Sequence, residues 1–189
     1  MVHNSTLERY INPDIASTPN LQFISVSRGI EAKMKTHYPN SKIKTIYNVV
    51  ELQNKVNVFE EINDEYILAV GRMASNNVKQ FDVLIDCYSK SILPKKNIKF
   101  LILGSGDLFE SLKSLVLELN LQNMVVFKGN QADLFTYYEK AKYLVLASKN
   151  EGLPTVLIES LVCGTPVISY DCESGPNEII QDRYNGLLI

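Results

Sequence analysis

Short apolar runs alternate with longer amphipathic segments along the chain from residue 66 onward. This alternation is typical of β-α-β units, in which helices cover both faces of a parallel sheet. Because crossover connections in such units are right-handed, the pattern predicts a doubly wound, Rossmann-like α/β fold. The strands are expected at 66–70, 98–103, 124–127, 143–146, 166–169 and 186–189, and the helices at about 78–91, 107–120, 132–141, 154–163 and 176–182.

The first part of the chain has a weaker pattern. Residues 1–20 are polar and rich in Asn, Ser, Thr and Pro, which favours a loop. An apolar run at 21–26 predicts a strand, and Ser27 is a suitable N-cap for a helix at about 28–37. A further strand is expected at 43–47, and the polar residues 49–64 suit a connector.

Composition narrows the class of protein. With 189 residues, 46% of them hydrophobic and 21% charged, the chain is long enough to bury a core. Its net charge of −2 does not favour binding to nucleic acid. The three cysteines, Cys87, Cys163 and Cys172, have no metal-site spacing and are expected to be thiols in a reducing compartment. No signal peptide or bilayer-spanning run is present, so we expect a cytoplasmic location.

Chemically active residues follow the expected strands. Ligands of doubly wound sheets bind beyond the carboxyl ends of the strands. Gly71 and Arg72 follow the first strand, and Lys79 is expected at the start of the next helix. Glu151 follows the fourth strand, and Glu159 lies on the helix after it. Cations bind phosphate oxygens and carboxylates accept hydrogen bonds from hydroxyls, so this rim suits a sugar attached to a diphosphate.

The helix after Glu151 supports the prediction of a site for a sugar attached to a diphosphate. Pro154 is expected in its first turn, and Gly164 in the left-handed position that ends it. Thr155 and Glu159 lie one turn apart on a narrow polar stripe of a helix that is otherwise expected to be buried. The free N–H groups at its amino terminus could bind an anion.

Several segments together resemble family-4 retaining glycosyltransferases with the GT-B fold. The longest matches the Glu-x7-Glu signature of that family, from Glu151 to Glu159. The others occur in the same order as in the family and extend the resemblance over about residues 21–189: Phe23–Ser27, Ile46–Asn48, Val70–Arg72, Leu103–Gly106, Cys163–Ile168, Ser174–Glu178 and Asn185–Leu188.

The resemblance implies transfer of a sugar from a UDP- or GDP-linked donor to a glycan or lipid-linked acceptor, with retained configuration, no metal and no cofactor. Bacterial surface polysaccharide or lipopolysaccharide synthesis is the expected setting. Arg72 and Lys79 would bind the diphosphate, Glu151 the sugar hydroxyls and Glu159 the ribose. The remaining donor-site residues that the resemblance implies are Gly71, Asn130, Gln131, Gly152, Leu153, Pro154 and Thr155.

The resemblance also predicts a division of the chain. Residues 1–48 would be a remnant of the acceptor-side domain, 49–64 a linker, and 65–189 an incomplete donor-binding domain. The chain is thus expected to be the C-terminal half of a GT-B fold, truncated at both ends and inactive alone. Peripheral membrane association would involve the missing domain. His3 is weakly similar to an acceptor-side histidine of the family.

Other interpretations of the function remain open. The chain could be a non-catalytic nucleotide-sugar-binding half that needs a separate acceptor domain, or a sugar-nucleotide epimerase with the same fold. An NAD-dependent oxidoreductase is disfavoured because no intact glycine fingerprint opens a helix: Phe109 replaces its third glycine, so Gly104–Gly106 is expected to form a structural turn. Ser174 and Pro176 are expected to cap and start a helix, and His37 to lie at the surface.

Overall fold

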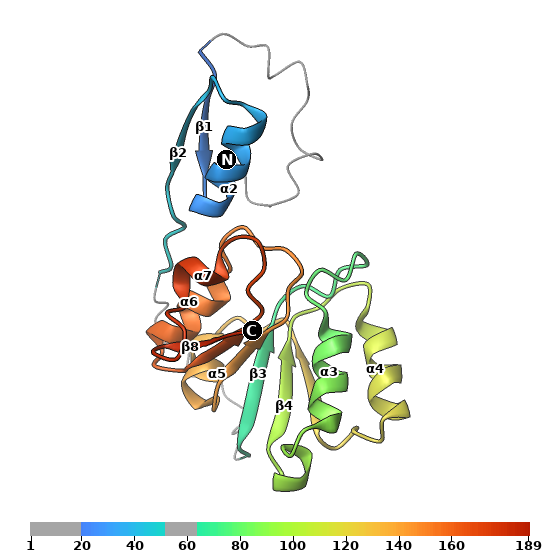
Figure 1. The fold of residues 1–189 in the computed structure, drawn as a ribbon. Helices are drawn as coiled ribbons and strands as arrows, with labels where there is room; N and C mark the ends of the chain where they lie inside the picture. Colours follow the sequence, from blue (N-terminus) through green and yellow to red (C-terminus); the bar gives the residue numbers. More distant parts are fainter. Residues whose placement is uncertain (1–19, 52–63) are drawn as a thin grey trace.

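The chain folds around a six-stranded parallel sheet in the computed structural model, which describes residues 20–51 and 64–189 (Figure 1). The strand order is β5-β4-β3-β6-β7-β8, which corresponds to the 3-2-1-4-5-6 order of Rossmann folds and reverses between β3 and β6. The strands are β3 (Tyr66–Val70), β4 (Lys99–Leu103), β5 (Val125–Gly129), β6 (Leu144–Leu146), β7 (Val167–Ser169) and β8 (Gly186–Leu188).

Helices cover both faces of this sheet. In Figure 1, α3 (Phe81–Lys90) and α4 (Phe109–Glu118) lie on one side of the sheet. The other side carries α5 (Phe135–Lys140), α6 (Thr155–Val162) and α7 (Pro176–Ile179). Successive residues of β3 belong to different hydrophobic clusters, one on each face, because side chains alternate along a strand. The predicted doubly wound α/β fold is therefore confirmed. A short 3-10 helix, η2 (Pro94–Lys96), was not predicted.

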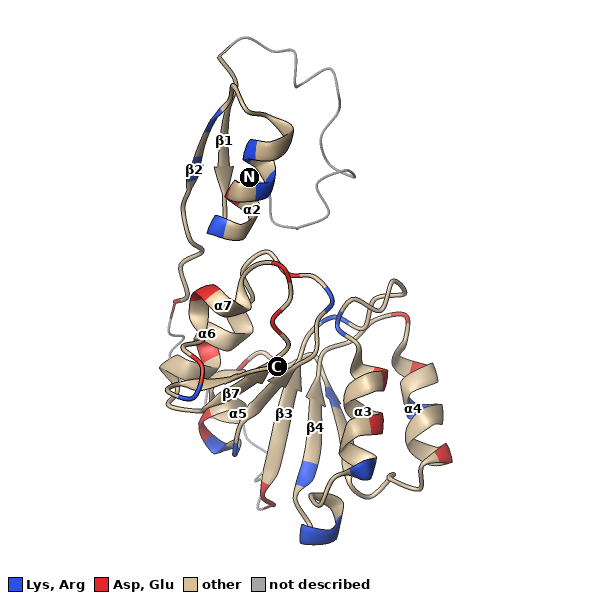
Figure 2. Cartoon of the chain, in the orientation of Figure 1, with Lys and Arg blue, Asp and Glu red and all other residues tan. Residues whose placement is uncertain are grey.

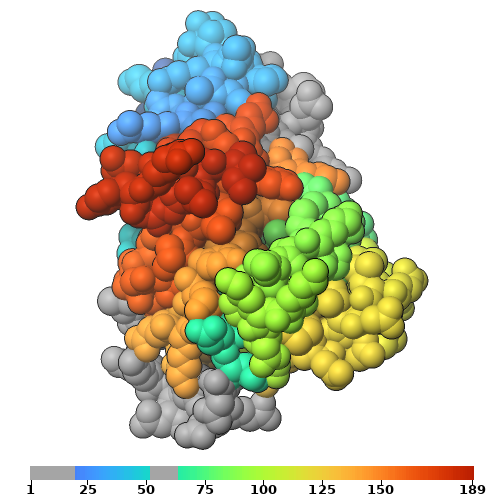
Figure 3. Space-filling view, turned by 60° about the horizontal axis from the view of Figure 1, so that its bottom comes forward, coloured from blue at the N-terminus to red at the C-terminus, as the bar shows by residue number. Residues whose placement is uncertain are grey.

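A smaller β-α-β unit precedes this sheet. Strands β1 (Gln22–Ser25) and β2 (Lys42–Thr45) pair in parallel, with α2 (Arg28–His37) between them. Ser27 is the N-cap of α2, as predicted, and its side chain accepts a hydrogen bond from the backbone N–H of Ile30. In the space-filling view of Figure 3, this blue unit lies directly against the orange and red C-terminal segments.

Some predicted helix boundaries are wrong. The last helix ends at Ile179 rather than at residue 182, because Ile180 has an extended backbone (φ −94°, ψ 121°). Its N-cap is Gly175, not Ser174, although Pro176 does start it. Pro154 is the N-cap of α6 rather than a first-turn residue, and α6 is less buried than predicted, since Val162 is 50% exposed. Gly164 has the predicted left-handed conformation (φ 79°).

Charge is mixed over the described surface. Figure 2 shows both signs on α3 and on the loops above the sheet. Among residues 20–51 and 64–189, no helix is long and apolar enough to cross a membrane. His37 is exposed, as predicted. His3 and most of the predicted linker lie outside the described residues.

Candidate functional site

The candidate site lies where the strand order reverses, between β3 and β6. Open crevices form at this point in doubly wound sheets because the connections leave in opposite directions. The loops that follow the two strands are joined by a hydrogen bond of 2.9 Å from the backbone N–H of Lys149 to the carbonyl oxygen of Val78. The residues predicted after the first and fourth strands therefore belong to one rim.

An ion pair connects these two loops. The Nζ of Lys79 lies 2.5 Å from Oε1 of Glu151, and the two side chains are only 22% and 12% exposed. The stem of Lys79 passes over Gly71: a Cβ on Gly71 would lie 3.3 Å from Cε of Lys79. Since both charged groups are partly removed from water, each stabilises the charge of the other more than an exposed pair would.

The position of Lys79 differs from the prediction. Helix α3 begins at Phe81, so Lys79 precedes it instead of lying in its first turn. Gln80 has a left-handed backbone (φ 50°), which reverses the chain between Lys79 and the helix. This turn lets the lysine extend back over Gly71 toward Glu151. Its charge is consequently not opposed by the dipole of α3 in the way that a first-turn lysine would be.

A second loop supports the backbone of Glu151. The hydroxyl of Ser174, which is fully buried, donates to the backbone carbonyl of Glu151 at 2.5 Å. Burial, together with the nearby Glu151 carboxylate, raises the pKa of the Cys172 thiol, so it stays protonated near neutral pH. The backbone of Glu151 is thus held by a neutral hydroxyl, and its carboxylate by Lys79.

Arg72 lines a hollow of about 540 Å³ next to this ion pair. The hollow, here called the Arg72 hollow, lies over the carboxyl ends of β3, β4 and β5. Asn130 lies at its edge and accepts a hydrogen bond of 3.1 Å from the hydroxyl of Ser105. The lining residues are Val70, Gly71, Arg72, Leu103, Gly104, Ser105, Gly106, Asn130, Gln131 and Leu134.

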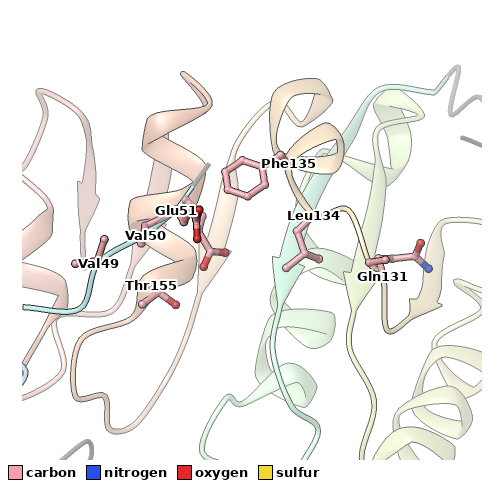
Figure 4. A pocket seen from close by; sticks show the side chains of 9 residues that line it. Val49, Val50, Glu51, Gln131, Leu134, Phe135 and Thr155 are labelled. Carbon is pink, nitrogen blue, oxygen red and sulfur yellow. The ribbon is translucent and has the colours of Figure 1, made fainter. Parts of the chain in front are cut away.

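A second hollow of about 370 Å³ adjoins the first, since Gln131 and Leu134 line both. In this Glu159 hollow, Val50 and Thr155 lie across from Leu134 and Gln131 (Figure 4). Both volumes are within the range of ordinary small-molecule sites. The lining residues are Val49, Val50, Glu51, Gln131, Ala132, Leu134, Phe135, Thr155 and Glu159.

Two polar side chains of the Glu159 hollow are held in place. The buried hydroxyl of Tyr138 donates to Oε2 of Glu159 at 2.7 Å, and burial raises the pKa of this tyrosine well above its usual value. Gln131 donates to the carbonyl oxygen of Lys128 at 2.6 Å and accepts from the hydroxyl of Tyr137 at 3.2 Å. A ligand would thus meet carboxylate and amide groups that are already oriented.

The structure brings the predicted residues together in three groups. Lys79 pairs with Glu151, Arg72 and Asn130 line the first hollow, and Thr155 and Glu159 line the second. Leu153 instead packs into a hydrophobic cluster with α2, and Gly152 and Pro154 are buried. Among the described residues, no group of three or more His, Cys, Asp or Glu side chains is placed to hold a metal ion.

Several residues around these hollows were not predicted from the sequence, among them Glu51, Leu134 and Tyr138. Glu51 falls in the segment read as a linker, Leu134 follows a polar loop, and Tyr138 lies 21 positions before the carboxylate that it holds. Nothing in the local pattern links Tyr138 to Glu159. An aromatic run at 135–138 was the one available signal that this helix is buried.

Comparisons with known proteins agree with this architecture. The family model for "Glycosyl transferases group 1" matches residues 50–189. Lipopolysaccharide 1,6-galactosyltransferase of Escherichia coli is 36% identical over 171 residues, which cover 87% of this chain and 47% of that protein. A Campylobacter jejuni enzyme, N-acetylgalactosamine-N,N'-diacetylbacillosaminyl-diphospho-undecaprenol 4-alpha-N-acetylgalactosaminyltransferase, is 36% identical over 151 residues, or 78% of this chain and 40% of the relative.

Solved structures show the same fold. S. aureus TarM has a TM-score of 0.83 at 24% identity and covers 100% of this chain with 39% of its own, a likeness that concerns the fold alone. The lipopolysaccharide outer core galactosyltransferase WaaB has a TM-score of 0.71 at 27% identity, covering 88% of this chain and 47% of its own. The chain spans about half the length of the curated relatives it matches. It belongs to the group 1 glycosyl transferases, as the resemblance in its sequence predicts.

Proposed function

We propose that the chain is the donor-binding half of a glycosyltransferase that moves a sugar from a nucleotide-sugar to a glycan or lipid-linked acceptor, with retention of configuration. The observation that carries this proposal is the Lys79–Glu151 pair beside the Arg72 hollow, at the reversal of strand order. A cation, a carboxylate and a second cation on one rim match the charges of a diphosphate and the hydroxyls of a sugar.

The two hollows suggest how the donor lies. Arg72 and Lys79 bind the diphosphate, and Glu151 accepts hydrogen bonds from the sugar hydroxyls. Backbone N–H groups of Gly152, Leu153 and Thr155 donate to the phosphates at the start of α6. Glu159, oriented by Tyr138, accepts hydrogen bonds from the ribose, and the loop at Asn130 and Gln131 borders the base.

The catalytic contribution of this half is electrostatic. As the bond between the anomeric carbon and the diphosphate oxygen breaks, negative charge develops on the leaving group, and Arg72 and Lys79 stabilise it. The new bond forms to the oxygen of the acceptor hydroxyl on the same face of the sugar, and the proton of this hydroxyl passes to the departing diphosphate oxygen. In this proposal the two side chains supply the positive charge, so no metal and no cofactor are needed.

The names of two relatives support the proposed acceptor. One acts on lipopolysaccharide and the other on a diphospho-undecaprenol-linked sugar, as their names state. We therefore propose a glycan or lipid-linked acceptor of the bacterial surface, and as a separate proposal a place at the cytoplasmic face of the membrane. Peripheral contact with the membrane would involve the acceptor side.

A binding module without activity of its own is the second candidate. It is favoured by the position of both hollows, because all of their lining residues belong to this chain. Such a module would bind the donor and transfer sugar only together with an acceptor domain. Donor binding without hydrolysis or transfer by the chain alone, and transfer after addition of the acceptor half, would identify it.

The proposed function is tested by calorimetric titration of the chain with a panel of UDP- and GDP-linked sugars. Arg72→Ala should weaken binding of the preferred donor by roughly 10- to 100-fold, since hydrogen bonds to charged groups contribute about 1.5–3 kcal/mol. Glu151→Gln should weaken binding of the nucleotide-sugar and leave binding of the free nucleoside diphosphate unchanged.

Matched controls are Arg183→Ala and Glu118→Gln, because neither residue lines either hollow. Both should bind as the unmodified chain does. If no nucleotide-sugar of the panel binds, or if Arg72→Ala and Glu151→Gln bind with unchanged affinity, the assignment is wrong.

A further inference from the structure

Glu178 on α7 binds the amino terminus of α2, 149 and 150 positions away in the sequence. Its Oε2 accepts from the backbone N–H of Arg28 at 2.8 Å, and its Oε1 from that of Gly29 at 3.0 Å. The hydroxyl of Tyr47 donates to the same carboxylate at 2.9 Å. Since Ser27 already accepts from the next two N–H groups, Glu178 completes the first turn of α2.

The same turn of α2 touches the loop that supports Glu151. A Cβ on Gly29 would lie 2.5 Å from Cβ of Ser174 and 3.2 Å from the carbonyl oxygen of Glu173. Only glycine permits this approach without a shift of the backbone. Ser174 in turn donates to the carbonyl of Glu151 at 2.5 Å. Gly29, Ser174 and Glu151 thus form a continuous series of contacts from α2 to the backbone of Glu151.

Further contacts join the small β-α-β unit to the loops that carry Glu151 and Ser174. Val26, Ile30 and Met34 of the small unit form one buried cluster with Leu153, two residues after Glu151. Lys33 pairs with Glu173 next to Ser174. In Figure 2, acidic colour on α7 and its preceding loop faces basic colour on α2. A displacement of α2 would therefore disturb both Leu153, which lies two residues after Glu151, and Ser174, which holds the backbone of Glu151.

We propose that Glu178 is a positioning residue that fixes Glu151 through α2: it holds Gly29 against Ser174, and Ser174 holds the backbone of Glu151. This inference rests on the proposed role of Glu151 toward the donor sugar. Its consequence is specific, because Glu151 is assigned to the sugar and Arg72 to the diphosphate. Loss of the Glu178 contacts weakens recognition of the sugar more than recognition of the nucleoside diphosphate, which Arg72 still binds.

The test compares two ligands on one chain. The ratio of Kd for the free nucleoside diphosphate to Kd for the nucleotide-sugar that the unmodified chain prefers is measured by calorimetry for each variant. Glu178→Gln replaces one acceptor oxygen by an amide that faces N–H donors, and should lower this ratio roughly fivefold or more. Gly29→Ala, which moves α2 away from Ser174 with Glu178 unchanged, should lower it in the same direction.

Glu173→Gln is the matched control. It makes the same chemical change at the same boundary but leaves the amino terminus of α2 bound. Because the side chains of the Lys33–Glu173 pair are 26% and 58% exposed, the pair contributes little, and the ratio should stay that of the unmodified chain. A uniform loss of stability would weaken binding of the nucleoside diphosphate and of the nucleotide-sugar to the same extent, so the ratio of their Kd values would not change. An unchanged ratio in folded Glu178→Gln or Gly29→Ala overturns the inference.

A readout without ligand separates this inference from the proposed function. Amide hydrogen exchange of residues 151–153 should accelerate in Glu178→Gln and not in Glu173→Gln, whether or not any nucleotide-sugar binds. If the unmodified chain binds no donor but exchange accelerates, Glu178 positions Glu151 as inferred and the proposed function of the site is wrong. Unaltered exchange at 151–153 in Glu178→Gln contradicts the inference itself.

Discussion

Gly104 lies where two loops of the candidate site approach most closely. Its backbone has φ 125°, and a Cβ at this position would lie 2.0 Å from the carbonyl oxygen of Gly71. Its own N–H donates to the carbonyl of Gly129 at 2.8 Å, so the loop cannot simply move away. The turn after β4 therefore has the structural role that its sequence predicts, and it also fixes the floor of the Arg72 hollow.

Gly104→Ala should lower the free energy of unfolding by roughly 2–4 kcal/mol, because it adds both a steric overlap and a disfavoured backbone conformation. Gly164→Ala is the matched control. Gly164 has φ 79°, but a Cβ added there would meet no heavy atom within 4 Å, so only the conformational cost of about 1–2 kcal/mol applies. Urea denaturation of both variants measures the difference, and equal losses would contradict the steric argument.

At the residue scale, the sequence predicted the charged groups of the site but not how they meet. The order of Gly71, Arg72, Glu151 and Glu159 along the chain identified them, and the structure places all four around the two hollows or their connecting ion pair. The pairing of Lys79 with Glu151 depends on the left-handed turn at Gln80. Glutamine seldom adopts that conformation, so no sequence rule could predict it. The roles of these charged residues toward a donor stay predictions.

At the scale of elements, strands were predicted more accurately than helices. Strand β3 was predicted with its observed bounds because its five residues are all buried and apolar. Helices α3 and α4 start two or three residues later than predicted, at Phe81 and Phe109, because the preceding loops use several turns before the helix begins. Apolar periodicity reports which face is buried, whereas the turn geometry at a helix start depends on neighbouring loops.

Tyr88 joins α3 to the start of β4 and gives this contact a dependence on pH. Its hydroxyl donates to the carbonyl oxygen of Ile98 at 2.7 Å, and its side chain is 3% exposed. Burial, with a smaller effect of the neighbouring Tyr143, raises the pKa of Tyr88 to about 12. In the unfolded chain the pKa is about 10. The protonated form is therefore favoured by the folded state.

Because the folded-state pKa is the higher one, the stabilisation is complete below pH 10 and is lost as the pH rises toward 12. The unmodified chain should thus lose stability more steeply than Tyr88→Phe between about pH 10 and 12. Urea midpoints measured at steps from pH 8 upward test this, with Tyr184→Phe as control because Tyr184 is 82% exposed. Parallel curves for the unmodified chain and Tyr88→Phe would contradict the shift.

At the scale of the whole molecule, the sequence predicted two parts but not their interface. The expected division into 1–48, 49–64 and 65–189 stays a prediction, since residues 1–19 and 52–63 lie outside the description. Contacts such as that of Glu178 with Arg28 and Gly29 join residues far apart in the chain, and neither segment carries a local sign of the other. Pairwise packing of this kind follows only from the folded arrangement.

The interface between the two parts contributes to stability through a small hydrophobic cluster. Ile30 on α2 is fully buried in the cluster that also contains Leu153 of the Glu151 loop. Ile24 on β1 is a natural comparison because the same side chain is 40% exposed there. The two isoleucines lie in one β-α-β unit, so truncating each separates interface packing from the general effect of removing an isoleucine.

Ile30→Ala should lower the free energy of unfolding by about 2–5 kcal/mol, since it removes buried methyl groups and leaves a cavity between the parts. Ile24→Ala should cost less than about 1 kcal/mol. Urea denaturation measures both values, and amide exchange shows where the loss is felt. Residues 151–153 should exchange faster in Ile30→Ala than in Ile24→Ala, because the cluster that contains Leu153 loses part of its packing. Faster exchange confined to α2 would mean that the small unit and the candidate site are stabilised independently.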